Sequence, residues 1–225
     1  MVILKGGGKT KQFGKPLFSG YYRHTNVRLC AVSTTAFFLF YQYHVMNEPF
    51  PDFSIPQRWY DIVMFCTDCR NNVKAMSRTA NAHAVYDAYS ALNIMHQKVT
   101  HAGRQNGRQL LEKAGVEKVS ADVAGGWSTG AGEGCYGNGL SLPSMRAMAG
   151  FPADEKVEWH YRLKHGDGVE HNFALEGYLC LLFFFFHELI LQDAAVLVDH
   201  YSHPVLNHPI FSSEEFITYK DELIT

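Results

Sequence analysis

The longest apolar run in this chain, residues 178–191, is the feature that most limits how the chain can fold. It contains four consecutive phenylalanines, Phe183 to Phe186, but it spans only fourteen residues and includes His187 and Glu188. A membrane-spanning helix needs about 20 apolar residues, so this run is too short and too polar to cross a bilayer. We therefore expect it to form a buried helix, within residues 173–199, in the interior of a globular domain.

Apolar residues recur every three to four positions in most of the chain, which is the spacing of a helix with one buried face. The helices predicted from this spacing cover residues 27–45, 72–92, 101–114, 142–149, 173–199 and 214–223. The last of them begins within Ser212-Ser213-Glu214-Glu215, a sequence that matches a capping box. Val2-Ile3-Leu4 is a short strand candidate, and three glycines after it predict a turn. The chain is therefore expected to be mainly α with a small N-terminal β element.

Length and composition favour one large domain, or a domain with an extension. The chain has 225 residues, of which 47% are hydrophobic and 14% aromatic, enough for a packed core. Its five cysteines are an odd number and no secretory leader precedes them, so a reduced intracellular setting is expected rather than a disulfide framework. Cys66 and Cys69 form a lone CxxC, which is more typical of two ordinary thiols than of a zinc or redox site.

Charge is distributed unevenly along the chain, although the net charge is only −2. Residues 1–153 hold 16 Lys and Arg against 9 Asp and Glu, whereas residues 154–225 hold 4 against 13. The first 47 residues contain no acidic residue at all. This asymmetry suggests a phosphate-facing region joined to a solvated or partner-facing one. An ordinary protein with an uneven surface would give the same counts, so both interpretations stay open on charge alone.

Four chemically capable side chains follow one another at informative spacing. His101-Ala-Gly-Arg104 begins one predicted helix, and Trp127 and Tyr136 lie in a glycine-rich loop predicted for residues 125–139. An arginine can hold two phosphate oxygens at once, and a histidine can donate to a third or move a proton near neutral pH. An indole N–H and a phenol complete a set suited to attack on a DNA phosphate.

The helical spacing puts His101 and Arg104 on one face, with Arg108 one turn further along. No acidic residue lies between Asp87 and Glu112, so a polyanion would not be repelled from this segment. The alternative is a helix whose histidine and arginines simply coat its exposed side.

Two other site types are weaker interpretations. Gly8-Lys9-Thr10 resembles the end of a nucleotide-binding P-loop, but Ile3 stands where that loop requires glycine. His200, His203 and His208, near Asp193 and Asp199, could suggest a metal, but they lie in a proline-interrupted loop without the helical HxxxH spacing. We expect polar turn residues there, with no metal and no cofactor.

The chain resembles the tyrosine recombinase superfamily, and within it the fungal branch that contains Crypton elements and the second domain of the yeast centromere DNA-binding kinetochore subunit. The segments that carry the resemblance are Gly7-Gly8-Lys9-Thr10-Lys11-Gln12, Arg23-His24, Thr35–Tyr41, Thr100–Arg104, Gly126-Trp127, Cys135-Tyr136, Met145–Phe151, Leu191–Ala195 and His208–Phe211. The resemblance implies a recombinase- or integrase-like core over residues 1–152 and an acidic helical extension over residues 153–225.

The resemblance also implies roles for individual residues. Tyr136 would attack the scissile phosphate and form a 3′-phosphotyrosine. His101, Arg104 and Trp127 would hold the non-bridging oxygens, and Lys9 would protonate the departing 5′ oxygen. The residues expected to contact DNA around them are Lys5, Lys11, Lys15, Arg23, His24, Arg28, Lys98 and Arg108.

Three departures from the superfamily pattern favour binding over catalysis. The superfamily's first arginine lies upstream of the lysine, whereas only eight residues precede Lys9 and none is Arg, so we expect a core truncated at its N-terminus. Gly126 stands where this branch commonly has arginine. Glycines on both sides of Tyr136 work against holding its phenol in place.

The expected function is therefore binding of double-stranded DNA, in the nucleus, without a small-molecule substrate and without a membrane. Two alternatives stay open. The chain is an active Crypton-like recombinase in one, and a protein-interaction module on the same fold in the other. Assembly into a homo-oligomer is compatible with each.

Overall fold

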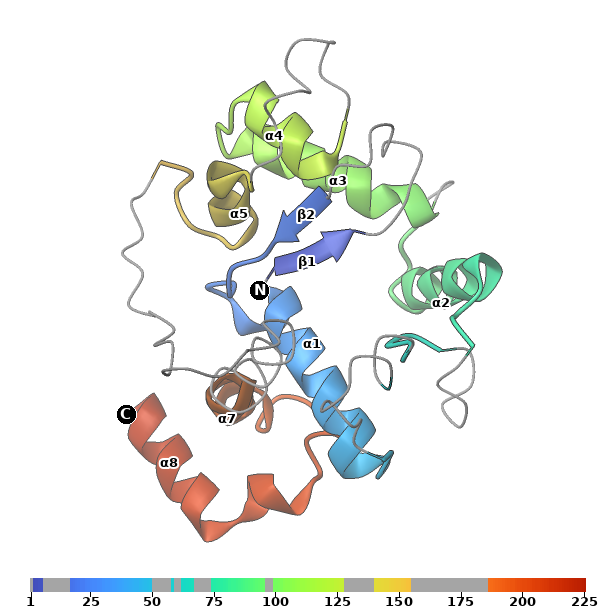
Figure 1. The fold of residues 1–225 in the computed structure, drawn as a ribbon. Helices are drawn as coiled ribbons and strands as arrows, with labels where there is room; N and C mark the ends of the chain where they lie inside the picture. Colours follow the sequence, from blue (N-terminus) through green and yellow to red (C-terminus); the bar gives the residue numbers. More distant parts are fainter. Residues whose placement is uncertain are drawn as a thin grey trace, which may run out of the picture. The chain divides into compact units, whose positions relative to one another are not determined.

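The computed structural model describes residues 2–5, 17–49, 58, 62–66, 74–95, 99–127, 140–154 and 186–225. In these ranges the chain is mainly helical, as the sequence predicts, and its small N-terminal β element is a two-stranded antiparallel sheet (Figure 1). The chain divides into two compact units. One comprises residues 21–51 and 149–225 together with Met1, and the other comprises residues 2–20 and 52–148. We call them the terminal unit and the central unit.

The central unit contains the sheet. Strand β1 (Val2–Lys5) pairs with β2 (Leu17–Gly20) in antiparallel register, with Val2 opposite Gly20. The predicted N-terminal strand is confirmed, whereas β2 was not predicted. A side chain at position 20 would lie 2.5 Å from the sulfur of Met145 in helix α5, so glycine at the end of β2 permits this close approach.

The helices of the central unit are α2 (Arg78–Ala91), α3 (Val99–Lys113), α4 (Lys118–Gly125) and α5 (Leu142–Met148). Helix α3 contacts each of the other three, and α4 contacts α5 (Figure 1). The buried apolar residues of these helices and of the turn between α3 and α4 are Ala102, Leu111, Val116 and Ala121. The hydroxyl of Ser144 in α5 donates to the backbone oxygen of Ser120, 3.0 Å away, and so ties α5 to α4.

Local sequence explains where most of these helices begin and end. Ser77 caps α2 by accepting from the backbone N–H of Ala80 at 3.0 Å, so the helix starts six residues later than the predicted residue 72. Helix α3 agrees with the prediction and ends before Gly115, whose φ of 73° suits glycine. Helix α4 was not predicted, because its eight residues carry too short an apolar pattern.

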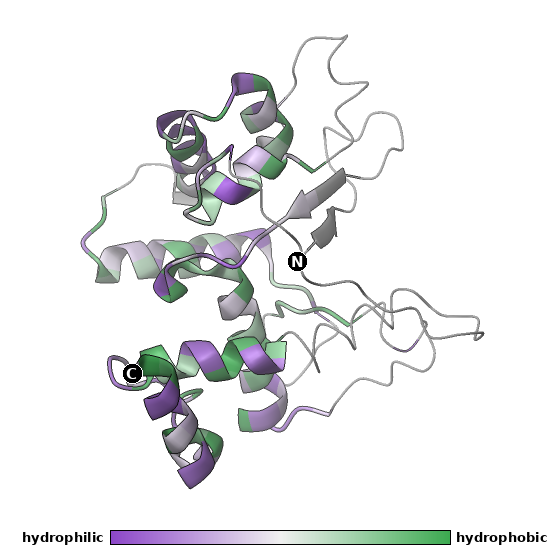
Figure 2. Cartoon of the chain, turned by 90° about the vertical axis from the view of Figure 1, so that its left-hand side faces the viewer, coloured by the Kyte–Doolittle hydropathy of each residue, from purple (hydrophilic) through white to green (hydrophobic). Residues whose placement is uncertain are grey.

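The terminal unit has a separate core. Its elements are η1 (Val27–Leu29), α1 (Ala31–Phe40), the π-helix η2 (Tyr41–Val45), α7 (His187–Leu197), η5 (Pro209–Ser212) and α8 (Glu214–Ile224). The buried residues that form its core are Cys30, Val32, Ala36, Leu39, Phe186, Leu189, Ile190, Ala194, Ala195, Phe211 and Phe216. In Figure 2, α8, which ends at the C marker, carries both hydrophobic and hydrophilic residues, as a helix with one buried face does.

The predictions for the terminal unit agree with the structure in position but differ in detail. The single helix predicted for residues 27–45 is divided into a 3-10 turn, an α-helix and a π-helix. The C-terminal half of the predicted helix 173–199 is confirmed as α7, and its residues 173–185 lie outside the described residues. The cap of α8 is Ser213, which accepts from the N–H of Phe216 at 3.2 Å. The capping box predicted from Ser212 therefore does not form.

No helix within the described ranges is both long and apolar enough to span a membrane.

Candidate functional site

Five side chains are predicted to surround a phosphate, and three of them, those of His101, Arg104 and Trp127, come together in the central unit. His101, Arg104 and Arg108 lie on one face of α3, and Trp127 approaches this face from the segment after α4. With Gln105 they line a hollow of about 420 Å³. The convergence of His101, Arg104 and Trp127 agrees with the sequence prediction, whereas Lys9 and Tyr136 lie outside the described residues.

The end of α4 determines where Trp127 lies. Gly126 adopts a left-handed conformation with φ of 62°, which turns the chain out of the helix. The backbone N–H of Trp127 then donates to the backbone oxygen of Asp122 at 2.9 Å. The indole folds back over Gly125, where a Cβ atom would lie only 2.1 Å from the ring carbon Cζ3. Both glycines therefore serve the placement of this tryptophan.

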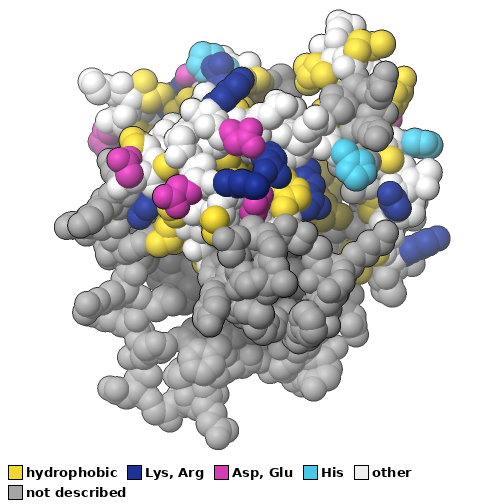
Figure 3. All heavy atoms as spheres, turned by 90° about the horizontal axis from the view of Figure 1, so that it is seen from above, with side chains coloured by type: hydrophobic (Ala, Val, Ile, Leu, Met, Phe, Trp, Pro, Cys, Tyr) yellow, Lys and Arg dark blue, Asp and Glu magenta, His cyan; other side chains and the backbone are white. Residues whose placement is uncertain are grey.

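Two guanidinium groups lie against the Trp127 ring. The Cζ atom of Arg104 is 5.2 Å from the ring centroid, and that of Arg108 is 5.1 Å away. Both distances are within the range of a cation–π interaction, which stabilises a cation on an aromatic face. Figure 3 shows Lys and Arg side chains gathered beside hydrophobic and acidic ones on the face seen from above.

The two arginines differ in how their charge is compensated. Arg108 donates from Nε to Glu112 at 3.0 Å, and its Nη2 lies 3.4 Å from Asp122. Arg104 is exposed, and no ion pair joins it to a carboxylate in the ranges that the structure describes. Among the described residues, Arg108 is therefore the arginine of this pair that has carboxylate partners.

Asp122 is the residue of this region that sequence reasoning missed. Its residue exposure is 4%, and its Oδ1 atom, 3.4 Å from Nη2 of Arg108, is within ion-pair distance of that arginine but forms no hydrogen bond among the described residues. An acidic residue in an unpredicted helix gave no signal in the sequence. Its position became meaningful only when α4 was found packed against α3.

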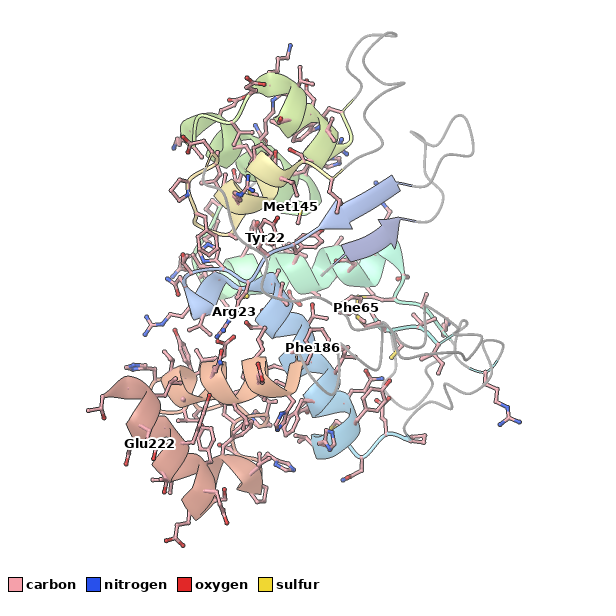
Figure 4. All side chains as sticks on the ribbon, turned by 60° about the vertical axis from the view of Figure 1, so that its left-hand side comes forward. Tyr22, Arg23, Phe65, Met145, Phe186 and Glu222 are labelled. Carbon is pink, nitrogen blue, oxygen red and sulfur yellow. The ribbon has the colours of Figure 1, made fainter. Side chains whose placement is uncertain are left out.

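Among the other predicted DNA-contacting residues, Arg23 has partners within the terminal unit. Its guanidinium donates to the Gln192 amide oxygen and to the carboxylate of Asp193. Asp193 is 1% exposed and also accepts from the Ser33 hydroxyl. Figure 4 shows the Arg23 side chain directed toward α7, which carries both acceptors. This arginine compensates a buried carboxylate.

His24 and Arg28 lie nearby in the same unit. The Nδ1 atom of His24 accepts from the backbone N–H of Asn26 at 2.8 Å. Arg28 is exposed and lies over the Tyr201 ring, with its Cζ atom 5.6 Å from the centroid. The remaining predicted contacts are lysines whose side chains lie outside the described part of the chain, namely Lys5, Lys11, Lys15 and Lys98.

Two of the three histidines considered for a metal site, His203 and His208, have side chains that accept from backbone N–H groups. His203 and His208 each accept through Nδ1, from the N–H groups of Val205 and Ile210 at 3.2 and 3.3 Å. Asp199 pairs with Lys220 at 2.9 Å. In the described ranges, no group of three or more His, Cys, Asp or Glu residues could hold a metal ion.

One comparison with known proteins gives a match. The sequence model of the family described as "Centromere DNA-binding protein complex CBF3 subunit, domain 2" matches residues 1–166. No curated protein and no solved structure matches the chain.

Proposed function

The chain belongs to the family of domain 2 of the centromere DNA-binding CBF3 subunit, and from this we propose that it binds double-stranded DNA. The proposed contact is between a backbone phosphate and the hollow lined by His101, Arg104 and Trp127. The observation that carries this assignment is the Arg104 guanidinium, exposed against Trp127 and without a carboxylate partner in the described ranges.

The chemistry of these three side chains suits a phosphate better than a base edge. The arginine fork matches two phosphate oxygens, and the charge-assisted bonds it forms are about twice as strong as neutral ones. His101 can donate to another oxygen of the same phosphate. Contacts of this kind position a protein on the duplex without reading its sequence, so the proposed site contributes affinity rather than target choice.

Arg104→Gln tests this proposal by fluorescence anisotropy on a short labelled duplex at several salt concentrations. Loss of one phosphate contact is expected to weaken binding about tenfold and to reduce the slope of log affinity against log salt by about 1. Arg78→Gln is the matched control, because Arg78 is an exposed arginine at the start of another helix of the same unit. Equal effects of the two substitutions would contradict the assignment to Arg104.

We also propose that residues 1–152 form a recombinase-type core and residues 153–225 an acidic extension that faces protein partners. The resemblance to tyrosine recombinases of the fungal Crypton branch supports the first part, and the family's description as a subunit of a complex supports the second. A nuclear location follows from centromere binding. Association with other copies of the chain is part of the same proposal, and sedimentation of the chain with and without duplex DNA tests it.

Catalysis is the alternative to binding alone, and Tyr136 distinguishes the two. An active recombinase would form a covalent adduct on a nicked duplex that traps the phosphotyrosine, and Tyr136→Phe would abolish the adduct. We propose that the chain binds such a duplex without forming an adduct. Denaturing gel electrophoresis separates these outcomes, and an adduct that requires Tyr136 would establish the enzyme instead.

A third reading is a module that has kept the fold for protein contacts alone. Such a module has lost its affinity for DNA, so the unaltered chain would not bind the short duplex at any salt concentration, whereas the proposed function requires binding that weakens as salt rises.

A further inference from the structure

We propose that Asp122 is a positioning residue, which holds Trp127 in the DNA-facing hollow by way of Arg108. The inference rests on the proposed function for its consequence in DNA binding. The positioning itself is a separate physical claim about the protein without DNA.

The first observation is that Asp122 has two connections to Trp127. Its backbone oxygen accepts from the N–H of Trp127 at 2.9 Å. Its carboxylate lies 3.4 Å from Nη2 of Arg108, whose guanidinium carbon is 5.1 Å from the centre of the Trp127 ring. The backbone of the tryptophan and the face of its indole are therefore both linked to one residue of α4.

The second observation is the burial of this carboxylate. The Asp122 side chain is only 6% exposed, and its Oδ1 atom has no hydrogen-bond partner among the described residues. An ionised carboxylate buried in this way is costly unless a positive charge compensates it. Arg108 is the cation that supplies this charge, so the need to compensate Asp122 restrains where the guanidinium can lie.

Glu112 provides the contrast. It also binds Arg108, at 3.0 Å, but its side chain is 58% exposed and is solvated whether or not the pair forms. An exposed pair of this kind restrains its members weakly. The two acidic partners of one arginine therefore differ in burial, and only Asp122 is expected to affect the position of the indole.

The role of the tryptophan makes this restraint useful. Arg104 and Arg108 both lie within 5.2 Å of the Trp127 ring centroid, so an indole fixed by Arg108 presents its face to Arg104. Arg104 then approaches a phosphate from a defined direction instead of losing side-chain freedom on binding. Asp122 acts in this scheme without touching DNA.

The test is ¹⁹F NMR of the full chain labelled with 5-fluorotryptophan, together with duplex affinity by anisotropy. The chain has three tryptophans, and the Trp127→Phe variant assigns the resonance of position 127. Asp122→Asn is expected to shift or broaden that resonance, to leave the other two unchanged, and to weaken duplex binding about three- to tenfold. Glu112→Gln is the matched control, expected to leave the resonance in place and not to weaken binding.

Arg108→Lys makes the route testable. It keeps a positive charge beside Asp122 but removes the planar group from the indole face, so the Trp127 resonance should shift in this variant too. With Lys at position 108, adding Asp122→Asn should then move the resonance little further, because the linking group is already gone. Fully additive shifts would overturn the proposed route through Arg108.

The remaining outcomes are also decisive. An unchanged Trp127 resonance in Asp122→Asn overturns the proposal, and so does an equal shift in Glu112→Gln. If Asp122→Asn does not fold, Arg108→Lys carries the test, and an unshifted resonance there overturns it. If the parent chain does not bind duplex DNA at any salt concentration, the proposed function fails, while the resonances still decide whether Asp122 positions Trp127.

Discussion

The indole of Trp127 occupies the space that a side chain on Gly125 would need. An added Cβ atom would lie 2.1 Å from Cζ3 of the ring, and two further ring carbons would be within 2.4 Å. The end of a flexible side chain could move away from the added Cβ atom by a small torsional change, but a rigid indole ring between two arginines cannot. This contact joins the last residue of a short helix to the candidate phosphate site.

Gly125→Ala should therefore displace Trp127 and weaken DNA binding without unfolding the central unit. We expect the affinity for a short duplex to fall about tenfold, since the indole no longer lies against Arg104. Anisotropy measures the affinity, and circular dichroism verifies the helix content. Gly107→Ala in α3 is the control, because a Cβ atom there meets nothing within 4 Å. Unchanged affinity in Gly125→Ala would show that the position of the indole does not matter.

Asp193→Asn should destabilise the protein strongly, because it removes the buried negative charge beside Arg23 and replaces one of the two oxygens that accept from Arg23 and Ser33 by an NH2 group. Removing one partner of a buried pair costs about 3–5 kcal/mol. Arg23→Gln should cost less, since the Arg23 side chain is 41% exposed and water replaces part of its interaction. Chemical denaturation of both variants gives the comparison.

Arg28→Gln is the control for that pair, because Arg28 is exposed and its guanidinium lies over the Tyr201 ring without an ion pair among the described residues. It should change the free energy of unfolding by less than about 1 kcal/mol. If Arg23→Gln were instead neutral for stability but weakened DNA binding, the expectation that Arg23 contacts DNA would be favoured over its role beside Asp193.

Gly150→Ala and Gly103→Ala should change stability in opposite directions. Gly150 has φ of 81°, and a Cβ atom there would lie 2.4 Å from the Thr25 hydroxyl, so alanine should destabilise the protein by more than about 1 kcal/mol. Gly103 lies inside α3 in open space, and alanine should stabilise that helix by roughly 0.5–1 kcal/mol. Thermal melting followed by circular dichroism measures both. If both substitutions raised the stability, or both lowered it, the argument from the backbone conformation of these two glycines would be wrong.

Ser213→Ala should remove the N-terminal cap of α8, at a cost of about 1 kcal/mol. Ser212→Ala should cost less, because the Ser212 hydroxyl donates to the Pro209 backbone oxygen and does not accept from an N–H group of α8. Urea denaturation of both variants distinguishes the observed cap from the one that the sequence pattern indicates. If Ser212→Ala lowered the free energy of unfolding more than Ser213→Ala does, the capping box that the sequence indicates would be the true cap of α8.

Much of the helical content was predictable because it depends on local signals. Helices α3, α5 and α8 lie within a residue or two of their predicted positions, since each has a clear apolar period or a terminating glycine or proline. Helix α4 and strand β2 were missed for the opposite reason. Each is too short for a period to stand out, and each is stabilised by packing, such as the approach of Gly20 to Met145.

The candidate site also has parts that local sequence predicts and parts that depend on tertiary packing. His101 and Arg104 were predicted to share a face because helix geometry alone places residues three apart together. Their convergence with Trp127 was a prediction from the family resemblance, and helix α4 realises it through the turn at Gly126. Nothing local indicated that Arg23 would pair with Asp193, which lies 170 residues away.

The sequence by itself determined the helical character of this chain, its basic N-terminal region and the candidate residues proposed for phosphate binding, because periodicity, charge and side-chain chemistry are local properties. The tertiary structure alone decided which of two arginines lies beside a buried carboxylate. Arg104 and Arg108 lie one turn apart on α3, and the sequence shows Glu112 four residues after Arg108 but gives no sign of the contact with Asp122. The packing of α4 against that helix buries Asp122 beside Arg108 and leaves Arg104 exposed. The contact between Arg108 and Asp122 depends on how two helices pack, and a residue's neighbours in the chain do not reveal that packing.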